Sequence, residues 1–202
     1  MLHIGVTGLM GSGKSTVARR FGEHGAHLVD ADAIGWEVLQ MAEIQESLVE
    51  RFGPVVLGPD GRVNRRVLGP MVFRDATAMA RLNSVVQPLL SRRVHHALFT
   101  IRGDGVAVLD AALLSVWRLE PELDGVVETV APAEIRTRRL RTSKGYSESE
   151  ARERVLGQTL PPVGGATRYW QIDNAGTKAE LLSRADQVWR EIEGLCAERR
   201  TK

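Results

Sequence analysis

Residues 8–15 read Gly-Leu-Met-Gly-Ser-Gly-Lys-Ser, a complete match to the pattern Gly-x-x-x-x-Gly-Lys-[Ser/Thr]. An apolar run at residues 2–6 precedes the match, and residues 15–21 follow it with the spacing of a helix. Glycines let a backbone curl until successive N–H groups point inward, and the start of the following helix adds partial positive charge. The order of strand, glycine-rich loop and helix therefore predicts a phosphate-binding loop, and a chance glycine-rich turn is the alternative.

The predicted loop assigns a role to each of its polar residues. Lys14 is expected to be catalytic, because its point charge can meet the β- and γ-phosphates of ATP. The Ser15 hydroxyl is expected to bind the Mg²⁺ ion that bridges those phosphates. The predicted cofactors are thus ATP and Mg²⁺. The predicted ATP-binding residues are Gly11, Ser12, Gly13, Lys14, Ser15 and Thr16.

Further apolar runs suggest where the rest of a sheet lies. They cover residues 27–29, 106–109, 126–130 and 169–172, and they alternate with segments of helical length. This alternation is typical of a parallel sheet covered on both faces. We therefore predict a three-layer α/β fold around a five-stranded parallel sheet. A last helix should pack on the sheet through Leu181, Ala185, Val188, Ile192 and Leu195.

A long segment separates the second and third predicted strands. Residues 33–102 have helical periodicity, interrupted by a turn-rich loop at residues 52–64. We interpret residues 1–202 as one domain that contains this helical insertion.

Three aspartates follow predicted strands, at the sheet edge where open α/β proteins bind ligands. Asp30 and Asp32 follow the second strand, and Asp32 is the expected acceptor of the proton from a substrate hydroxyl. Either residue could instead only cap a helix beginning near residue 33. Asp110 follows the third strand, where a carboxylate commonly helps to hold Mg²⁺; a turn or capping role is its alternative.

A basic segment is expected to form a lid. Residues 136–154 contain seven Lys or Arg and three Glu, and the lid is placed at about residues 136–165. Arginines there could close over phosphates and exclude water. A solvated helix face, with pairs such as Glu150 and Arg154, is the alternative.

The composition limits the other classes of function. Twenty-seven Lys and Arg against 25 Asp and Glu leave a net charge of +2, which gives no reason to expect nucleic-acid binding. The single cysteine, Cys196, cannot form an internal disulfide, and no apolar stretch is long enough for a membrane span. With no leader-like segment at residues 1–6, the expected setting is the cytoplasm. We expect small-molecule partners, no membrane and no structural metal, and a monomer or weak homo-oligomer.

Along nearly its whole length the chain resembles the dephospho-CoA kinase family. The resemblance begins with residues 4–21 (IGVTGLMGSGKSTVARRF) and residues 29–32 (Val-Asp-Ala-Asp). It continues at Arg65, Leu68, Phe73, Leu82, Asn83, Pro88, Asp110, Leu113, Leu114, Arg139, Leu140, Gln158 and Asn174.

The resemblance implies an activity and roles for individual residues. The implied reaction is transfer of phosphate from ATP to the ribose 3′-hydroxyl of 3′-dephospho-CoA, which gives CoA and ADP. Asp32 would act as the base, Arg139 would contact phosphate as a catalytic residue, and Asp32 and Arg65 would bind the substrate. The helical insertion would receive dephospho-CoA.

Several positions depart from the family pattern, and they cluster in the predicted acceptor and lid regions. They are Gln87 for histidine, Ala112 for proline, Val116 for an acidic residue, Gly164 and Gly165 for basic residues, and Arg168-Tyr169 for Ala-Asp. They leave two alternatives open: another small-molecule kinase of the same fold, or an ATP-binding relative with little or no transferase activity.

Overall fold

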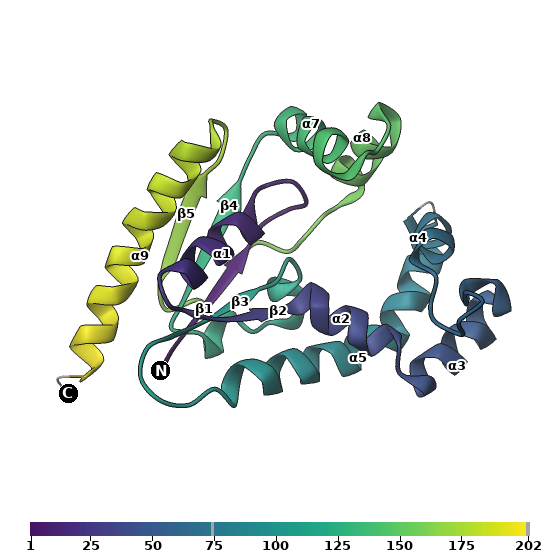
Figure 1. Ribbon diagram of the computed structural model, residues 1–202, viewed down its shortest axis with the longest axis horizontal. Coiled ribbons are helices and arrows are strands. Elements are labelled where there is room, and N and C mark those ends of the chain that lie inside the picture. Colours follow the sequence, from purple (N-terminus) through teal and green to yellow (C-terminus); the bar gives the residue numbers. More distant parts are fainter. Residues whose placement is uncertain (74, 201–202) are drawn as a thin grey trace. The chain divides into compact units, whose positions relative to one another are not determined.

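The computed structural model describes residues 1–73 and 75–200. Its five strands are all parallel and lie in the order β2-β3-β1-β4-β5. Figure 1 shows β1 in the middle of the sheet. The strand bounds are β1 Leu2–Thr7, β2 His27–Asp30, β3 Val106–Asp110, β4 Gly125–Val130 and β5 Tyr169–Asp173. The predicted five-stranded parallel sheet is confirmed.

One face of the sheet packs against α1 (Lys14–Glu23) and α9 (Lys178–Arg200). Ile4 and Val6 of β1, which are fully buried, belong to this core together with Phe21 and Ile192 from the two helices. Side chains two apart along a strand share a face, so β1 presents a continuous apolar surface to the helices. Figure 1 shows α9 running beside β5, as its predicted apolar face required.

The other face is covered by the segments around β3 and by the end of α5. Gly5 of β1 lies against Leu114 and Leu123, which follow β3 in the chain. His3 packs its ring on Phe99 at 4.8 Å between centroids. Short helices occur in this layer: α6 (Leu114–Trp117) and a 3₁₀ turn, Glu120–Glu122. The three-layer arrangement is thus confirmed.

The chain divides into two compact units. Residues 1–30 and 98–202 contain the sheet, and residues 31–97 form the second unit. The helical periodicity predicted for the insertion is confirmed. Its elements are α2 (Ala31–Leu39), α3 (Ala42–Phe52), a 3₁₀ turn (Pro54–Val56), α4 (Arg65–Phe73) and α5 (Ala76–Phe99), whose last residues belong to the first unit.

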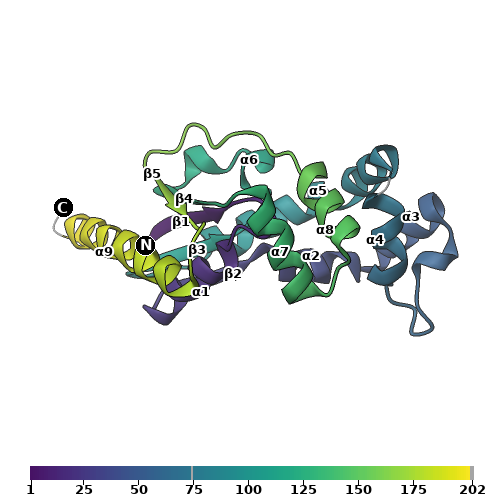
Figure 2. The same ribbon diagram turned by 90° about the horizontal axis from the view of Figure 1, so that it is seen from above.

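Two helices occupy the segment predicted as a lid. They are α7 (Ala133–Lys144) and α8 (Glu148–Gly157), and both views show them packed together. In Figure 2 they follow one another between β4 and the chain that leads to β5. Ser147 and Glu150 form a capping box that starts α8. Within residues 1–73 and 75–200, no helix combines the length and apolarity that crossing a membrane requires.

Candidate active site

The glycines of the loop at residues 8–13 are required by its geometry. Gly11 and Gly13 have φ angles of +80° and +105°, a region that side chains strongly disfavour. A methyl group on Gly11 would stand 3.0 Å from the backbone oxygen of Arg136 in α7. On Gly13 it would stand 2.3 Å from the side-chain nitrogen of Asn174. The loop is therefore packed between α7 and the segment that follows β5.

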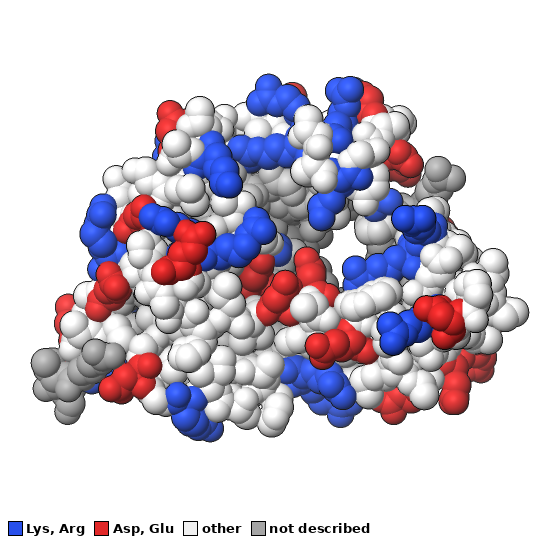
Figure 3. All heavy atoms as spheres, in the orientation of Figure 1, with Lys and Arg blue, Asp and Glu red and all other residues white. Residues whose placement is uncertain are grey.

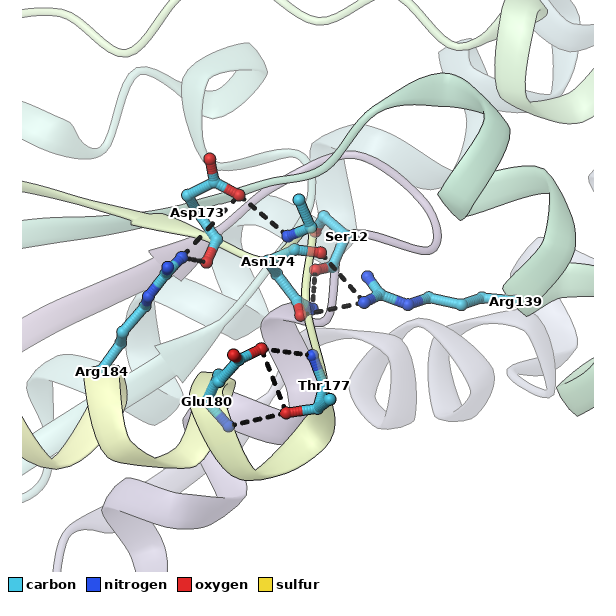
Figure 4. Close-up of polar contacts among 8 residues, drawn as sticks. Ser12, Arg139, Asp173, Asn174, Thr177, Glu180 and Arg184 are labelled. Carbon is cyan, nitrogen blue, oxygen red and sulfur yellow. Dashed lines mark hydrogen bonds and ion pairs between the residues drawn. The ribbon is translucent and has the colours of Figure 1, made fainter.

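Arg139 and Asn174 bind carbonyl groups of this loop; Figure 4 shows the bond of Asn174 to Ser12 and the contact of Arg139 with Asn174. Arg139 Nη1 donates to the oxygen of Gly11 at 3.2 Å, and Asn174 Nδ2 donates to that of Ser12 at 2.6 Å. Arg139 Nη2 also donates to the backbone and side-chain oxygens of Asn174, each at 2.9 Å. With its carbonyls held on the outside, the loop can present N–H groups to an anion on the inside.

A buried hydroxyl pair fixes the same loop to the sheet. The hydroxyls of Ser12 and Thr129 are 2.6 Å apart, and Thr129 also donates to the carbonyl of Thr7. Both side chains are almost fully buried. The Ser12 side chain therefore anchors the loop to β4, and its predicted contact with ATP is left to its backbone.

Lys14 lies between two other predicted site residues. Its Nζ is 2.6 Å from Asp110 Oδ1 and 3.4 Å from Ser15 Oγ. The Lys14 and Asp110 side chains are only 12% and 11% exposed, so their ion pair is shielded from water. The parallel register places Asp110 opposite Val6, at the strand end from which the loop departs. Sheet order thus brings together residues that sequence reasoning predicted separately.

The oxygen atoms near Lys14 suit Mg²⁺. A serine hydroxyl and a carboxylate are hard ligands, and Mg²⁺ usually takes one or two protein ligands and completes its shell with phosphate and water. Among the described residues no cluster of three or more His, Cys, Asp or Glu could hold a metal ion. Ser15 and Asp110 therefore fit a metal that arrives with phosphates. Thr16 lies in the first turn of α1, where its N–H donates to Gly13.

The second unit holds the other predicted residues, Asp32 and Arg65. Helix α2 begins at Ala31, two residues before the expected start, so Asp32 lies inside its first turn. Trp36 lies one helical turn after Asp32, and the Arg65 guanidinium stacks over its ring at 4.1 Å. Burial lowers the Arg65 pKa, and the nearby Asp32 carboxylate partly opposes that shift. The unit thus gathers a carboxylate, a guanidinium and an indole.

The lid arginines divide into two groups. Figure 3 shows Lys and Arg side chains gathered where Figure 1 places α7 and α8. Arg138 is exposed, whereas Arg136 is only 8% exposed and its Nε and Nη1 have no hydrogen-bond partner in the described part of the chain. Burial lowers the pKa of Arg136 and of Arg139. A solvated helix face describes Arg138 but neither of these two.

Two polar residues were missed because their contacts are tertiary. Thr129 carries no motif, and Glu128 beside it accepts a hydrogen bond from Tyr169 at 2.5 Å. Burial and the Glu128 carboxylate both raise the Tyr169 pKa. The departure at Tyr169 is thus tied to the neighbouring strand. Of the other departures, Val116 is 46% exposed and Gly165 adopts a φ of +73°.

Comparisons with known proteins agree on one family. The family model for dephospho-CoA kinase matches residues 2–180. A dephospho-CoA kinase of Thermobifida fusca is 38% identical over 96% of this chain and 97% of its own length. One of Mycolicibacterium paratuberculosis is also 38% identical, but this chain spans only 47% of it. A solved Thermus thermophilus protein superposes with a TM-score of 0.69 at 30% identity, covering 98% and 97% of the two chains. The chain belongs to the dephospho-CoA kinase family.

Proposed function

We propose that this protein transfers the γ-phosphoryl group of ATP to the ribose 3′-hydroxyl of 3′-dephospho-CoA, giving CoA and ADP. The observation that most supports a transferase is the Lys14–Asp110 pair at the end of the loop, with Ser15 in reach. A relative that had lost transfer would have no need to keep a shielded lysine, a carboxylate and a hydroxyl together there. Membership of the family supports the choice of acceptor.

In the proposed mechanism the loop binds the phosphates, and its amides and Lys14 neutralise their charge. Lys14 Nζ, held by Asp110 at 2.6 Å, turns to the β- and γ-phosphate oxygens. Asp110 and Ser15 are the residues that would hold Mg²⁺ when it is bound with the phosphates. Bound there, Mg²⁺ would supply positive charge that neutralises the phosphates.

The second unit supplies the groups proposed for the acceptor. Asp32 is the proposed base, because a carboxylate can orient the 3′-hydroxyl and accept its proton as the bond to phosphorus forms. Arg65 is proposed to bind the anionic part of the acceptor, and its stacking on Trp36 limits the motion of its guanidinium. A contact between Arg139 and phosphate stays a prediction, since both Nη atoms are bonded to the loop and to Asn174.

The test is the release of ADP from Mg-ATP with and without 3′-dephospho-CoA, with the position of the new phosphate found by ³¹P NMR. We expect acceptor-dependent release and a 3′-phosphorylated product. Asp32→Asn should reduce kcat by at least about 100-fold while leaving the affinity for ATP unchanged. A fully active Asp32→Asn variant would exclude this residue as the base without excluding the reaction.

The two alternatives give different results in the same assay. Another small-molecule kinase would release ADP with a different acceptor, such as a nucleoside monophosphate or a sugar acid, but not with dephospho-CoA. An ATP-binding protein without transferase activity would bind Mg-ATP and release no ADP with any acceptor. Either result would reject the proposed function.

A further inference from the structure

A cavity of about 220 Å³ lies at the start of the loop. Gly8 and Leu9, the first residues of the loop, form one wall, and Ser115 and Glu128 contribute polar groups. The chain between α8 and β5 forms another wall through Leu160 and Val163, which are half-buried. This strap, residues 158–163, is attached to the loop because the Gln158 side-chain oxygen accepts a hydrogen bond from the Met10 N–H at 2.6 Å.

The charge of this cavity is opposite to that of the phosphate site. Among its described lining residues there is one carboxylate, Glu128, and no lysine or arginine. Tyr169 holds one oxygen of that carboxylate in place at 2.5 Å. A phosphate here would face a negative charge with no basic side chain to offset it. The occupant should therefore be uncharged, with hydrogen-bond donors for Glu128 and apolar atoms for the strap.

We infer that this cavity binds the pantetheine arm of the acceptor; the inference rests on the proposed function. The acceptor has an anionic end, the adenosine diphosphate part, and a neutral arm with two amides, a hydroxyl, a geminal dimethyl group and a thiol. The arm provides N–H and O–H donors for Glu128 and methyl groups for Leu160 and Val163.

Size and position support the arm over a nucleotide. Sites for drug-sized ligands usually have volumes of about 300–1,000 Å³, so about 220 Å³ suits a segment of a chain better than a whole nucleotide. The cavity shares the loop with the phosphate site, and Ser115 follows Asp110 by only five residues. Asp110, the partner of Lys14, lies opposite Val6, just before the loop residues that line the cavity, so one long acceptor can occupy the cavity and reach the phosphate site.

The test fills the cavity and compares two acceptor-site ligands. Leu160→Trp places a large ring on the cavity wall, and Leu156→Trp makes the same change at a 63% exposed position outside the lining. The ligands are 3′-dephospho-CoA and the methyl ester of ADP at its terminal phosphate, which lacks the arm. The second is measured as a competitive inhibitor, so the result does not depend on its being phosphorylated.

We expect Leu160→Trp to raise the KM for 3′-dephospho-CoA about tenfold, with the KM for ATP and the Ki of the methyl ester unchanged. Leu156→Trp should behave as the unaltered protein. Val163→Trp, on the same strap, gives an independent second result if Leu160→Trp does not fold.

The other outcomes distinguish failure of this inference from failure of the proposed function. An unchanged KM for 3′-dephospho-CoA, or an equal rise in the Ki of the methyl ester, means that the arm does not bind in the cavity. A rise in the KM for ATP alone assigns the cavity to the nucleotide. If the unaltered protein does not phosphorylate 3′-dephospho-CoA at all, the proposed function fails and this inference fails with it.

Discussion

Lys14 and Asp110 are 96 positions apart in the chain, yet their side chains form a shielded ion pair. Removing one partner of such a pair leaves an uncompensated charge in a poorly solvated place. Lys14 therefore influences both stability and the proposed chemistry, and the two effects can be separated by changing both partners.

Lys14→Met should abolish acceptor-dependent ADP release, with a loss of at least about 1,000-fold in kcat/KM, and should lower the free energy of unfolding by about 3 kcal/mol. The double variant Lys14→Met with Asp110→Asn should recover most of the stability and none of the activity. Urea denaturation and the ADP assay measure the two quantities. Recovery of activity in the double variant would contradict the proposed role of Lys14.

Arg139 and Asn174 act on the loop through its carbonyl groups. Figure 4 shows the bond from Asn174 to Ser12 and the bonds from Arg139 to Asn174. Arg139→Ala removes three hydrogen bonds, and we expect the KM for ATP to rise about tenfold because the loop amides lose their alignment. Arg138→Ala, at the exposed neighbouring position, is the matched control. Asn174→Ala should reproduce the rise, since it removes the bond to Ser12. A loss of kcat at unchanged KM would instead favour a direct contact between Arg139 and the transferring phosphate.

The sequence could predict those site residues that belong to a motif or follow a strand. Lys14 and Ser15 have fixed places in the motif, and Asp110 follows an apolar run. Only the order of the strands in the sheet was then needed to predict that these three residues lie close together. The bonds from Arg139 to Gly11 and from Thr129 to Thr7 join segments more than 100 positions apart, and no local pattern encodes them. The role of Asp32 stays a prediction.

At the scale of elements, the three inner strands β1, β3 and β4 were predictable because most of their residues on both faces are buried, which produces continuous apolar runs. Each predicted strand lies within one or two residues of the observed one. Helix starts were less predictable. An aspartate is favourable both as the cap before a helix and inside its first turn, so Asp32 did not show that α2 begins at Ala31. The four-residue helix α6 is too short to show a period.

The contact between α1 and α9 is expected to depend on pH. Arg20 of α1 and His24, the residue after its end, bond Asp186 of α9, and these bonds, chiefly that of Arg20, lower the Asp186 pKa. A carboxyl whose pKa is lower in the folded chain adds stability above its unfolded pKa and loses it as the pH falls through the folded value. The unaltered protein should therefore have a higher Tm than Asp186→Asn, by its full amount above about pH 4 and by a shrinking amount below that pH. A difference that stays constant down to pH 2 would contradict this assignment.

At the scale of the whole molecule, the proposed site residues are shared between the two compact units. Lys14, Ser15 and Asp110 belong to one unit, and Asp32 and Arg65 belong to the other. The two substrates should therefore protect different parts of the chain, because a bound ligand stabilises the elements that contact it.

Hydrogen exchange measured by mass spectrometry can follow this division. We expect Mg-ATP to slow exchange at least about tenfold in residues 8–16, and 3′-dephospho-CoA to extend protection into residues 31–39 and 65–73. The Lys14→Ala variant, which should lose the effect of Mg-ATP, is the control. Protection of residues 31–39 by Mg-ATP alone would contradict the assignment of that unit to the acceptor.

The position of β1 in the sheet has a consequence for synthesis on the ribosome. The strand made first ends up between β3 and β4, whose residues lie more than 100 positions later. Until residues 106–110 leave the exit tunnel, β1 has no neighbour with which to pair, and its second neighbour comes only with residues 125–130. Its apolar residues meanwhile stay available to other chains. Residues 31–97 form a compact unit of their own, so their contacts can form before the sheet is complete. The nucleotide loop, although it follows the first of the five strands to be made, is therefore completed only after β3 and β4 have joined the sheet.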